Sequence, residues 1–400
     1  MTGKNYTLQT FLHGEIMRIA FVTNNYTPYS GGVVSSINAV VHGLHGAGHD
    51  ILIIAPDFLG KRHHDPDYVI RVPTIYRFIY KKNHMAIPWR ANTFVLDSIK
   101  AYNPDVVHVH HPFLLGASGL YAAQKIDVPC VFTYHSLYHD FYEHYTPSFF
   151  PVPTCMVKPF ISSWVAHFCR SVDGVIAPSG FIKEYIRSQG VTIPIEVIPS
   201  SLQPLFMSQN GTQELSNASK DFFELLVVSR FAKEKNLPFV FEVLAQLPRC
   251  VRLTLVGYGA EYEFLQQLAY ITHGFSQERV RFIHKPSAQD LLRWYQSADL
   301  FLFSSYLDTQ GLVMVEAMSQ GLPVIALDGP GQRDIVSNGM NGYMVSGVED
   351  AVAVISNIIK NDTLYSLLKE GALRTAQRYH PNVQLQQLFT FYDNIMTYER

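Results

Sequence analysis

Residues 299–331, DLFLFSSYLDTQGLVMVEAMSQGLPVIALDGPG, contain the pattern that decides the fold. The apolar run 299–303 ends at two serines and predicts a buried strand, and a loop that contains Asp308 follows it. Residues 312–319 have helical character, and a following glycine and proline stop that helix before a second apolar run. The stretch therefore predicts a strand, a loop, a helix and a second strand, with glycine at the entry to the helix.

The entry to this helix is suited to an anionic ligand. A helix N-terminus offers free backbone N–H groups and a partial positive charge, both of which favour phosphate. Two carboxylates flank the entry, because Asp308 precedes the helix and Glu316 lies inside it. One carboxylate could hold a sugar ring while the other holds a ribose, so the spacing fits a nucleotide sugar laid across the end of a helix.

Length and composition indicate a globular protein of more than one domain. A chain of 400 residues predicts two or three domains, and its 48% hydrophobic and 16% charged residues allow a sizeable core and exclude disorder. The net charge of −2 argues against a nucleic-acid partner. The four cysteines form no C-x-x-C pair, which favours a reduced, cytoplasmic compartment without a zinc or redox motif. No run of 18 apolar residues predicts a membrane span.

Apolar strands and helices alternate twice along the chain, on either side of the polar segment 207–220. This pattern predicts two doubly wound, Rossmann-like α/β domains that face each other across a cleft. We expect an N-terminal extension at residues 1–16, a first domain at 17–206, an interdomain linker or surface loop at 207–220 and a second domain at 221–380. The last residues, 381–400, predict one amphipathic helix.

Histidines end two predicted strands of the first domain. Period-two alternation places His108 and His110 on the same face of one strand. Ligands of open α/β sheets gather at the carboxyl ends of strands, which favours a functional role for His110 over a structural one. The next strand ends in His135, and a segment rich in tyrosine and histidine follows it. That segment either binds a substrate or forms an aromatic helix that packs beneath the site; its members include Tyr138, Tyr142 and His144.

Two kinds of phosphate-binding pattern occur near strand ends. Arg230 and Lys235 follow an apolar strand, where their charges would neutralise a diphosphate without a metal. The pair Gly31-Gly32 follows the first strand and predicts either a phosphate-facing turn or a simple tight turn. Gly257-x-Gly259 ends another strand and is a weak cofactor signal by itself.

Residues 61–90 interleave basic and aromatic side chains in a chain that is otherwise nearly neutral. The basic members include Arg77 and Arg90, and the aromatic members include Tyr76 and Trp89. This combination predicts contact with an anionic membrane surface, and a solvated loop face is the equal alternative.

Taken together, these motifs resemble the retaining glycosyltransferases of family 4, which have the GT-B fold. The family signature has an acidic residue, seven residues and then a glutamate, and here it reads Asp308-x7-Glu316, followed by AMSQGLPV. Aspartate stands at the first position, where glutamate is usual. The tyrosine- and histidine-rich segment, together with residues 309–313, resembles the branch that glucosylates diacylglycerol.

The resemblance implies roles for particular residues. Arg230 and Lys235 would hold the diphosphate, Asp308 the donor sugar, and Glu316 the ribose. His110 matches the active-site histidine near the donor sugar. Further donor contacts are expected from Gly31, Gly32, Gly257, Gln310, Gly311, Leu312 and Val313, and acceptor contacts from His135, Tyr138, Tyr142 and His144. Neither a metal nor a cofactor is expected, and Asp65-Pro-Asp67, formally a metal-binding D-x-D, is interpreted as a turn.

The function that the resemblance implies is retaining, metal-independent transfer of a hexose, most simply glucose from UDP-glucose, to a membrane lipid such as diacylglycerol. The first domain would bind the acceptor, the second the nucleotide sugar, and the last helix would cross back to the first domain. The enzyme would be peripheral on the inner face of the cell membrane. The alternatives are GDP-mannose-dependent transfer to phosphatidylinositol or a soluble sugar, a sugar-nucleotide epimerase, and a non-catalytic nucleotide-sugar-binding protein.

Overall fold

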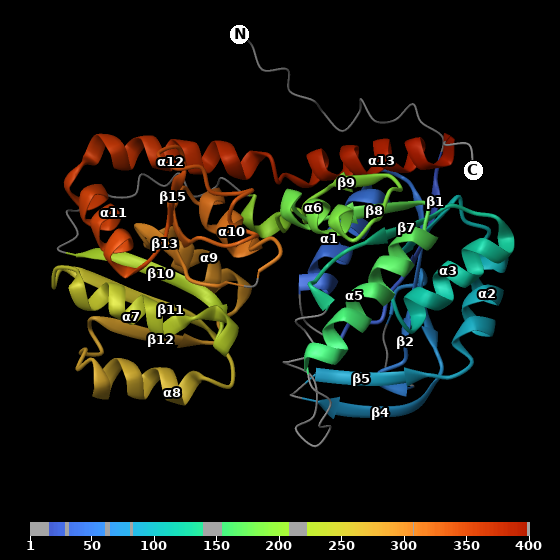
Figure 1. Cartoon of the computed structure of the whole chain (residues 1–400), viewed down its shortest axis with the longest axis horizontal. Helices are drawn as coiled ribbons and strands as arrows, with labels where there is room; N and C mark the ends of the chain where they lie inside the picture. Colours follow the sequence, from blue (N-terminus) through green and yellow to red (C-terminus); the bar gives the residue numbers. More distant parts are fainter. Residues whose placement is uncertain are drawn as a thin grey trace, which may run out of the picture. The chain divides into compact units, whose positions relative to one another are not determined.

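The computed structural model describes residues 16–28, 32–60, 65–80, 83–138, 154–207, 222–306 and 308–397. The chain divides into two compact units, residues 1–201 with 381–400 (unit 1) and residues 202–380 (unit 2) (Figure 1). The predicted extension and the predicted linker lie outside the described residues, apart from Ile16 and Met207.

Unit 1 is built on a parallel sheet whose described strands follow the order β3-β2-β1-β6-β7-β8-β9. Chain order runs outward in opposite directions from β1 and β6, so these two neighbours form the topological switch point of a doubly wound sheet. The strands are β1 (Arg18–Val22), β2 (Asp50–Pro56), β3 (Val69–Val72), β6 (Val106–Val109), β7 (Cys130–Thr133), β8 (Gly174–Ala177) and β9 (Ile195–Val197).

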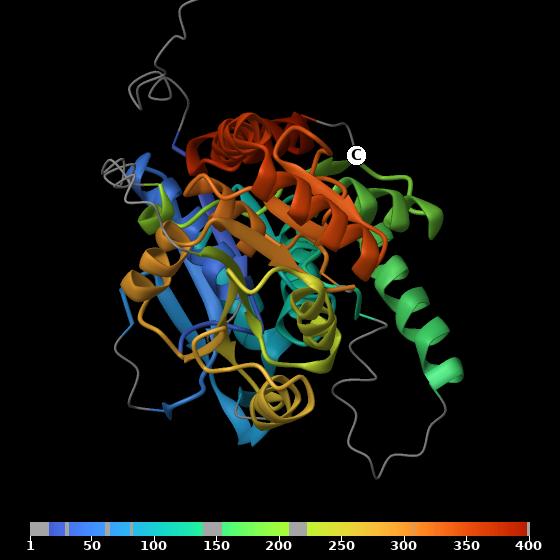
Figure 2. The ribbon, with the colours of Figure 1, turned by 90° about the vertical axis from the view of Figure 1, so that its left-hand side faces the viewer.

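Helices cover both faces of this sheet (Figures 1 and 2). One apolar core joins the sheet to α2 (Ala91–Tyr102), α3 (Leu115–Ile126), α5 (Thr154–Ser171) and α6 (Gly180–Ser188). Figure 2 shows α5 at the edge of the unit, with its first turns projecting outward. The other core joins the sheet to α1 (Gly32–Gly46) and α13 (Pro381–Thr397), so the last helix of the chain packs on unit 1.

An antiparallel hairpin of β4 (Thr74–Tyr80) and β5 (Asn83–Pro88) interrupts the parallel pattern of unit 1. The sequence did not predict these strands, which lie in the basic and aromatic segment 61–90. The hairpin and the residue after it expose large apolar side chains, namely Ile75, Tyr76, Met85, Ile87 and Trp89. We call these five residues the hairpin patch.

Unit 2 has a second parallel sheet, whose described strands follow the order β12-β11-β10-β13-β14-β15. Its switch point lies between β10 and β13. The strands are β10 (Phe223–Arg230), β11 (Val251–Tyr258), β12 (Val280–His284), β13 (Leu300–Phe303), β14 (Val324–Leu327) and β15 (Gly342–Val345). The helices are η3 (Pro204–Phe206), η4 (Lys233–Lys235), α7 (Leu237–Gln246), α8 (Tyr262–Gln267), η5 (Leu268–Thr272), α9 (Ala288–Ser297), α10 (Leu312–Ser319), α11 (Val348–Lys360) and α12 (Asp362–Gln377).

The stretch 299–331 folds as its sequence predicts, into β13, a loop, α10 and β14. Gly311 caps α10 at φ 72°, a conformation that favours glycine, and a Cβ there would lie 2.5 Å from Met314 Cε. The α/β class and the two doubly wound sheets are confirmed, and both switch points bring predicted site residues to one edge of their own sheet.

Candidate active site

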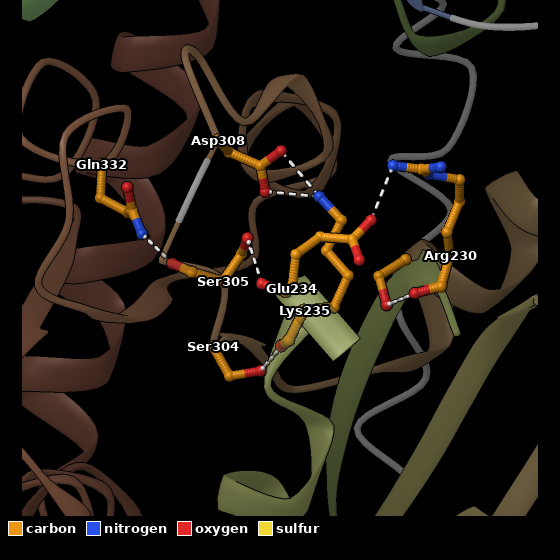
Figure 3. Close-up of polar contacts among 8 residues, drawn as sticks. Arg230, Glu234, Lys235, Ser304, Ser305, Asp308 and Gln332 are labelled. Carbon is orange, nitrogen blue, oxygen red and sulfur yellow. Dashed lines mark hydrogen bonds and ion pairs between the residues drawn. The ribbon is translucent and has the colours of Figure 1, made fainter. Parts of the chain in front are cut away.

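The switch point of unit 2 brings two loops together. The loop after β10 holds Lys235, and the loop after β13 holds Ser304, Ser305 and Asp308. The Ser304 hydroxyl donates to the backbone carbonyl of Lys235 at 2.7 Å, and the Ser305 hydroxyl donates to that of Glu234 at 3.2 Å (Figure 3). These bonds fix the backbone of the two loops relative to each other.

Each predicted diphosphate-binding cation is paired with a carboxylate (Figure 3). The Lys235 ammonium donates to both oxygens of Asp308, at 2.7 and 2.8 Å. Arg230 donates to Glu234, four residues further along the chain, at 2.9 Å. The first pair is largely buried, with side chains 13% and 25% exposed, whereas the Arg230 side chain is 56% exposed. Unit 2 therefore gathers two cations at one sheet edge, each with its own counter-ion.

A glycine-rich loop after β14 supports the position of Asp308. A Cβ at Gly331 would lie 2.3 Å from the backbone oxygen of Asp308, so only glycine allows this close approach. Gln332 is fully buried, and its amide donates to the carbonyls of Ser305 at 2.6 Å and Leu327 at 3.1 Å. The three loops at this edge thus form one connected framework.

Glu316 lies inside α10 and is buried. Its carboxylate accepts a hydrogen bond from the Tyr295 hydroxyl of α9 at 2.9 Å. Burial raises the pKa of Glu316 to about 7, against the lowering effect of the bond from Tyr295. Tyr295 is a candidate site residue that sequence reasoning missed, because its contact with Glu316 joins residues 21 positions apart.

We expect Glu316→Gln to stabilise the protein at alkaline pH. A carboxyl group whose folded pKa lies above 4.5 favours the folded state most below pH 4.5, and that contribution is lost as the pH rises through about 7. The loss amounts to about 3 kcal/mol. The thermal midpoint of the variant minus that of the wild type should therefore increase as the pH is raised from 5 to 8. Glu370→Gln is the control, because Glu370 belongs to an exposed ion pair with Arg374 on α12. Equal pH dependence in both variants would contradict the assignment.

Apart from Gly31 and Gly32, which belong to unit 1, the other predicted donor contacts lie at the same edge of unit 2. Gln310 is buried next to Gly311, and Leu312 and Val313 open α10. Gly257 has φ 156°, and a Cβ there would lie 1.8 Å from the backbone oxygen of Ser229. Close packing of the neighbouring strands β10 and β11 therefore explains Gly257 without a ligand.

The switch point of unit 1 gathers histidines. His108 and His110 lie on one face of the β6 edge and stack with ring centroids 4.4 Å apart. His110 Nδ1 lies 2.8 Å from His135 Nε2, while His108 contacts the hydroxyls of Tyr392 on α13 and Thr133 on β7, both at 2.6 Å. His110 Nε2 is buried and has no hydrogen-bond partner among the described residues.

The histidine cluster is uncharged near neutral pH. Burial, followed by neighbouring imidazoles, lowers the pKa of His110 well below its usual 6.5. The same cause lowers the pKa of His108 and of His111 to about 3, and burial lowers that of His135 to about 4. A neutral imidazole donates or accepts a hydrogen bond without adding a positive charge.

Asn24 holds the loop that carries His111, and sequence reasoning missed it. Its side-chain amide donates to the carbonyl of Phe113 at 2.9 Å and accepts from the backbone N–H of Leu115 at 2.9 Å. Its backbone N–H donates to His111 Nδ1 at 3.2 Å. The available signal was its place, two residues after the end of β1 at the switch point.

The predicted acceptor residues are only partly described. His135 contacts His110, and Tyr138 is buried against Phe113 and Tyr134 with ring centroids 5.7 and 5.3 Å away. The position of Tyr138 fits the packing alternative. Gly32 begins α1, where a Cβ would meet no atom within 4 Å. Tyr142, His144 and Gly31 lie outside the described residues.

The formal D-x-D motif lies in unit 1, away from both clusters in the chain. Asp65 binds Arg71 through two hydrogen bonds, at 2.6 and 2.9 Å, and Asp67 lies in a turn before β3. This geometry fits the predicted turn.

Known proteins with the same pattern identify the family. Residues 30–202 match the model of Glycosyltransferase Family 4, and residues 212–375 match that of Glycosyl transferases group 1. The chain is 31% identical to a GDP-mannose-dependent alpha-mannosyltransferase of Mycobacterium tuberculosis, over 82% of this chain and 84% of the relative. It is 28% identical to an alpha-monoglucosyldiacylglycerol synthase of Streptococcus pneumoniae, over 85% and 77%. The structure of Anabaena HepE in complex with UDP matches with a TM-score of 0.72 at 19% identity, covering 94% of this chain and all of HepE.

The two α/β units, each with a parallel doubly wound sheet, show that the protein is a glycosyltransferase of the GT-B fold. The chain belongs to glycosyltransferase family 4, as its sequence motifs predict. In the part of the chain that the structure describes, no helix has the length and apolar character needed to cross a bilayer.

Proposed function

We propose that the protein is a retaining glycosyltransferase that moves glucose from UDP-glucose to a membrane lipid such as diacylglycerol. The observation that carries the proposal is the pair of cations beside Asp308 and α10 at the switch point of unit 2. A diphosphate needs this concentration of positive charge at a sheet edge. Similarity to the alpha-monoglucosyldiacylglycerol synthase of Streptococcus pneumoniae supports the sugar and the lipid.

The donor chemistry is assigned to unit 2. Arg230 and Lys235 neutralise the leaving diphosphate, which makes a metal unnecessary for that step. The N-terminus of α10, near Gly311, adds its backbone N–H groups and partial positive charge. Asp308 binds hydroxyls of the donor sugar, and Glu316 binds the ribose. The bond from Tyr295 orients the Glu316 carboxylate for that contact.

The reaction proceeds by front-face transfer. The described contacts of His110 are aromatic and imidazole rings, none of which supplies a carboxylate nucleophile. The departing diphosphate oxygen therefore takes the proton of the acceptor hydroxyl as that hydroxyl attacks the same face of the sugar. Neutral His110 acts beside the reacting carbon, where an uncharged ring tolerates an oxocarbenium-like centre.

The acceptor reaches the enzyme from an anionic membrane surface, on the inner face of the cell membrane. The hairpin patch supplies exposed aromatic and aliphatic side chains, and Arg90 lies next to Trp89. Aromatic residues flanked by basic ones suit the headgroup region of a bilayer.

Replacing Tyr76 and Trp89 together with serine should weaken vesicle binding roughly tenfold, because two large apolar side chains no longer enter the headgroup region. Sedimentation with vesicles of phosphatidylcholine and phosphatidylglycerol measures the effect. The matched control replaces Phe264 and Ile271, two exposed apolar residues of unit 2, with serine. Equal binding by the two double variants would show that the hairpin patch is not the membrane contact.

A second candidate is GDP-mannose-dependent transfer to phosphatidylinositol or a soluble sugar. The mannosyltransferase of Mycobacterium tuberculosis favours it, since it shares 31% identity with this chain. The diphosphate site serves either nucleotide, because both donors present the same diphosphate.

The discriminating experiment measures hydrolysis and transfer with UDP-glucose, UDP-galactose, UDP-GlcNAc and GDP-mannose, with and without diacylglycerol vesicles, in the presence of a chelator. UDP-glucose turnover that vesicles stimulate and the chelator leaves unchanged supports the first proposal. GDP-mannose turnover supports the second. Nucleotide binding without turnover of any donor would replace both with a binding protein.

A further inference from the structure

The two cations assigned to the diphosphate differ in how firmly they are held. The Arg230 side chain is 56% exposed and gives a single bond to Glu234, in an ion pair of the kind that contributes little to stability. Lys235 is largely buried and gives two N–H···O bonds to one carboxylate, that of Asp308. Arg230 is therefore ready to accept an anion, whereas Lys235 must first leave Asp308.

The backbone around the Lys235–Asp308 pair is fixed, so a change of partner falls on the side chains. Ser304 binds the carbonyl of Lys235, and Gln332 binds the carbonyl of Ser305 (Figure 3). Gly331 packs against the backbone of Asp308. A lysine side chain has four rotatable carbon–carbon bonds and can turn its ammonium group without moving this framework.

A carboxylate and a phosphate offer the ammonium group the same kind of contact, an anionic oxygen that accepts N–H bonds. Asp308 presents two such oxygens to Lys235. A bound diphosphate would place further negative charge near Asp308, so the carboxylate both competes for Lys235 and repels the ligand.

We propose that Asp308 is a stand-in for the diphosphate, occupying Lys235 when the site is empty. The Lys235–Asp308 pair opens when the donor binds, which frees the carboxylate for the sugar, and closes again as the nucleoside diphosphate product leaves. Asp308 thereby lowers the affinity of the enzyme for its own product. The inference rests on the proposed function and assigns to the same site a role in product release.

The test measures binding of UDP, GDP and inorganic pyrophosphate to the full-length protein by calorimetry. Asp308→Asn removes the competing charge and retains a similar shape. We therefore expect this variant to bind pyrophosphate, and at least one of UDP and GDP, on the order of tenfold more tightly than the wild type does. Asp308→Glu keeps the charge and should bind these ligands as the wild type does. Glu370→Gln removes an equal charge from an exposed pair on α12 and should change nothing.

Steady-state kinetics supply the second readout. Product inhibition by the nucleoside diphosphate should be correspondingly stronger in Asp308→Asn, while transfer falls because the sugar contact is weakened. Wild-type binding with unchanged or weaker binding by Asp308→Asn would overturn the inference and leave the proposed function standing. Failure of the wild type to bind UDP, GDP or pyrophosphate would overturn both.

Discussion

Replacing Arg230 with alanine is expected to lower kcat/KM for the nucleotide-sugar donor by about 100- to 1,000-fold, the usual effect of removing one preorganised charge from a developing anion. Arg230 ends β10 at the switch point, and its only described ion-pair partner is Glu234. Negative charge grows on the diphosphate as the glycosidic bond breaks, so the loss should fall on kcat as well as on KM.

The same substitution should leave the fold intact. Arg230 is more than half exposed, and its i,i+4 pair contributes less than about 1 kcal/mol to stability. Arg293→Ala is the matched control, because Arg293 is also an exposed arginine of unit 2 that pairs with a nearby carboxylate, Asp290. Thermal unfolding compares the stability of the two variants, and initial rates compare their activity. Equal activity in the two would remove Arg230 from the diphosphate site.

The location of the unit 2 site could be predicted because it follows from strand order. Arg230 ends one predicted strand and Asp308 follows another, and parallel strands bring their carboxyl ends to one edge. The partners of these charges could not be predicted. Lys235 and Asp308 are 73 residues apart, and their contact depends on side-chain conformations and on the close approach that Gly331 permits. The sequence therefore assigned Asp308 to a sugar without indicating its ion pair.

In unit 1 the sequence correctly predicted that His108 and His110 share one face of β6, but it predicted only some of their contacts. Alternation along β6 is a local property of the backbone, so His108 and His110 could be placed together. The contact between His108 and Tyr392 joins residues 284 positions apart, and no local pattern indicates it. The β4–β5 hairpin was missed for a different reason, because its mixed basic and aromatic residues lack the clean alternation of a half-buried strand.

Replacing His110 with alanine should lower kcat by about 100-fold or more, the usual effect of removing one positioned polar group that stabilises developing charge in the transition state. The donor KM should change little, because the assigned diphosphate contacts lie in unit 2 and do not include His110. His42→Ala is the control, since His42 is an exposed histidine on α1 of the same unit. A large rise in donor KM with unchanged kcat would make His110 a binding residue instead.

The pH dependence of kcat tests whether His110 works as a neutral ring. An ordinary histidine gains its proton near pH 6.5, but burial and three neighbouring imidazoles hold the pKa of His110 well below that value. Lowering the pH from 8 to 6 therefore leaves the ring neutral, and His110 should contribute no change in kcat across this interval. Protonation at lower pH would add a positive charge beside an oxocarbenium-like centre, so activity must then fall rather than rise. An inflection near pH 6.5 that His110→Gln abolishes would show that the imidazole titrates during catalysis.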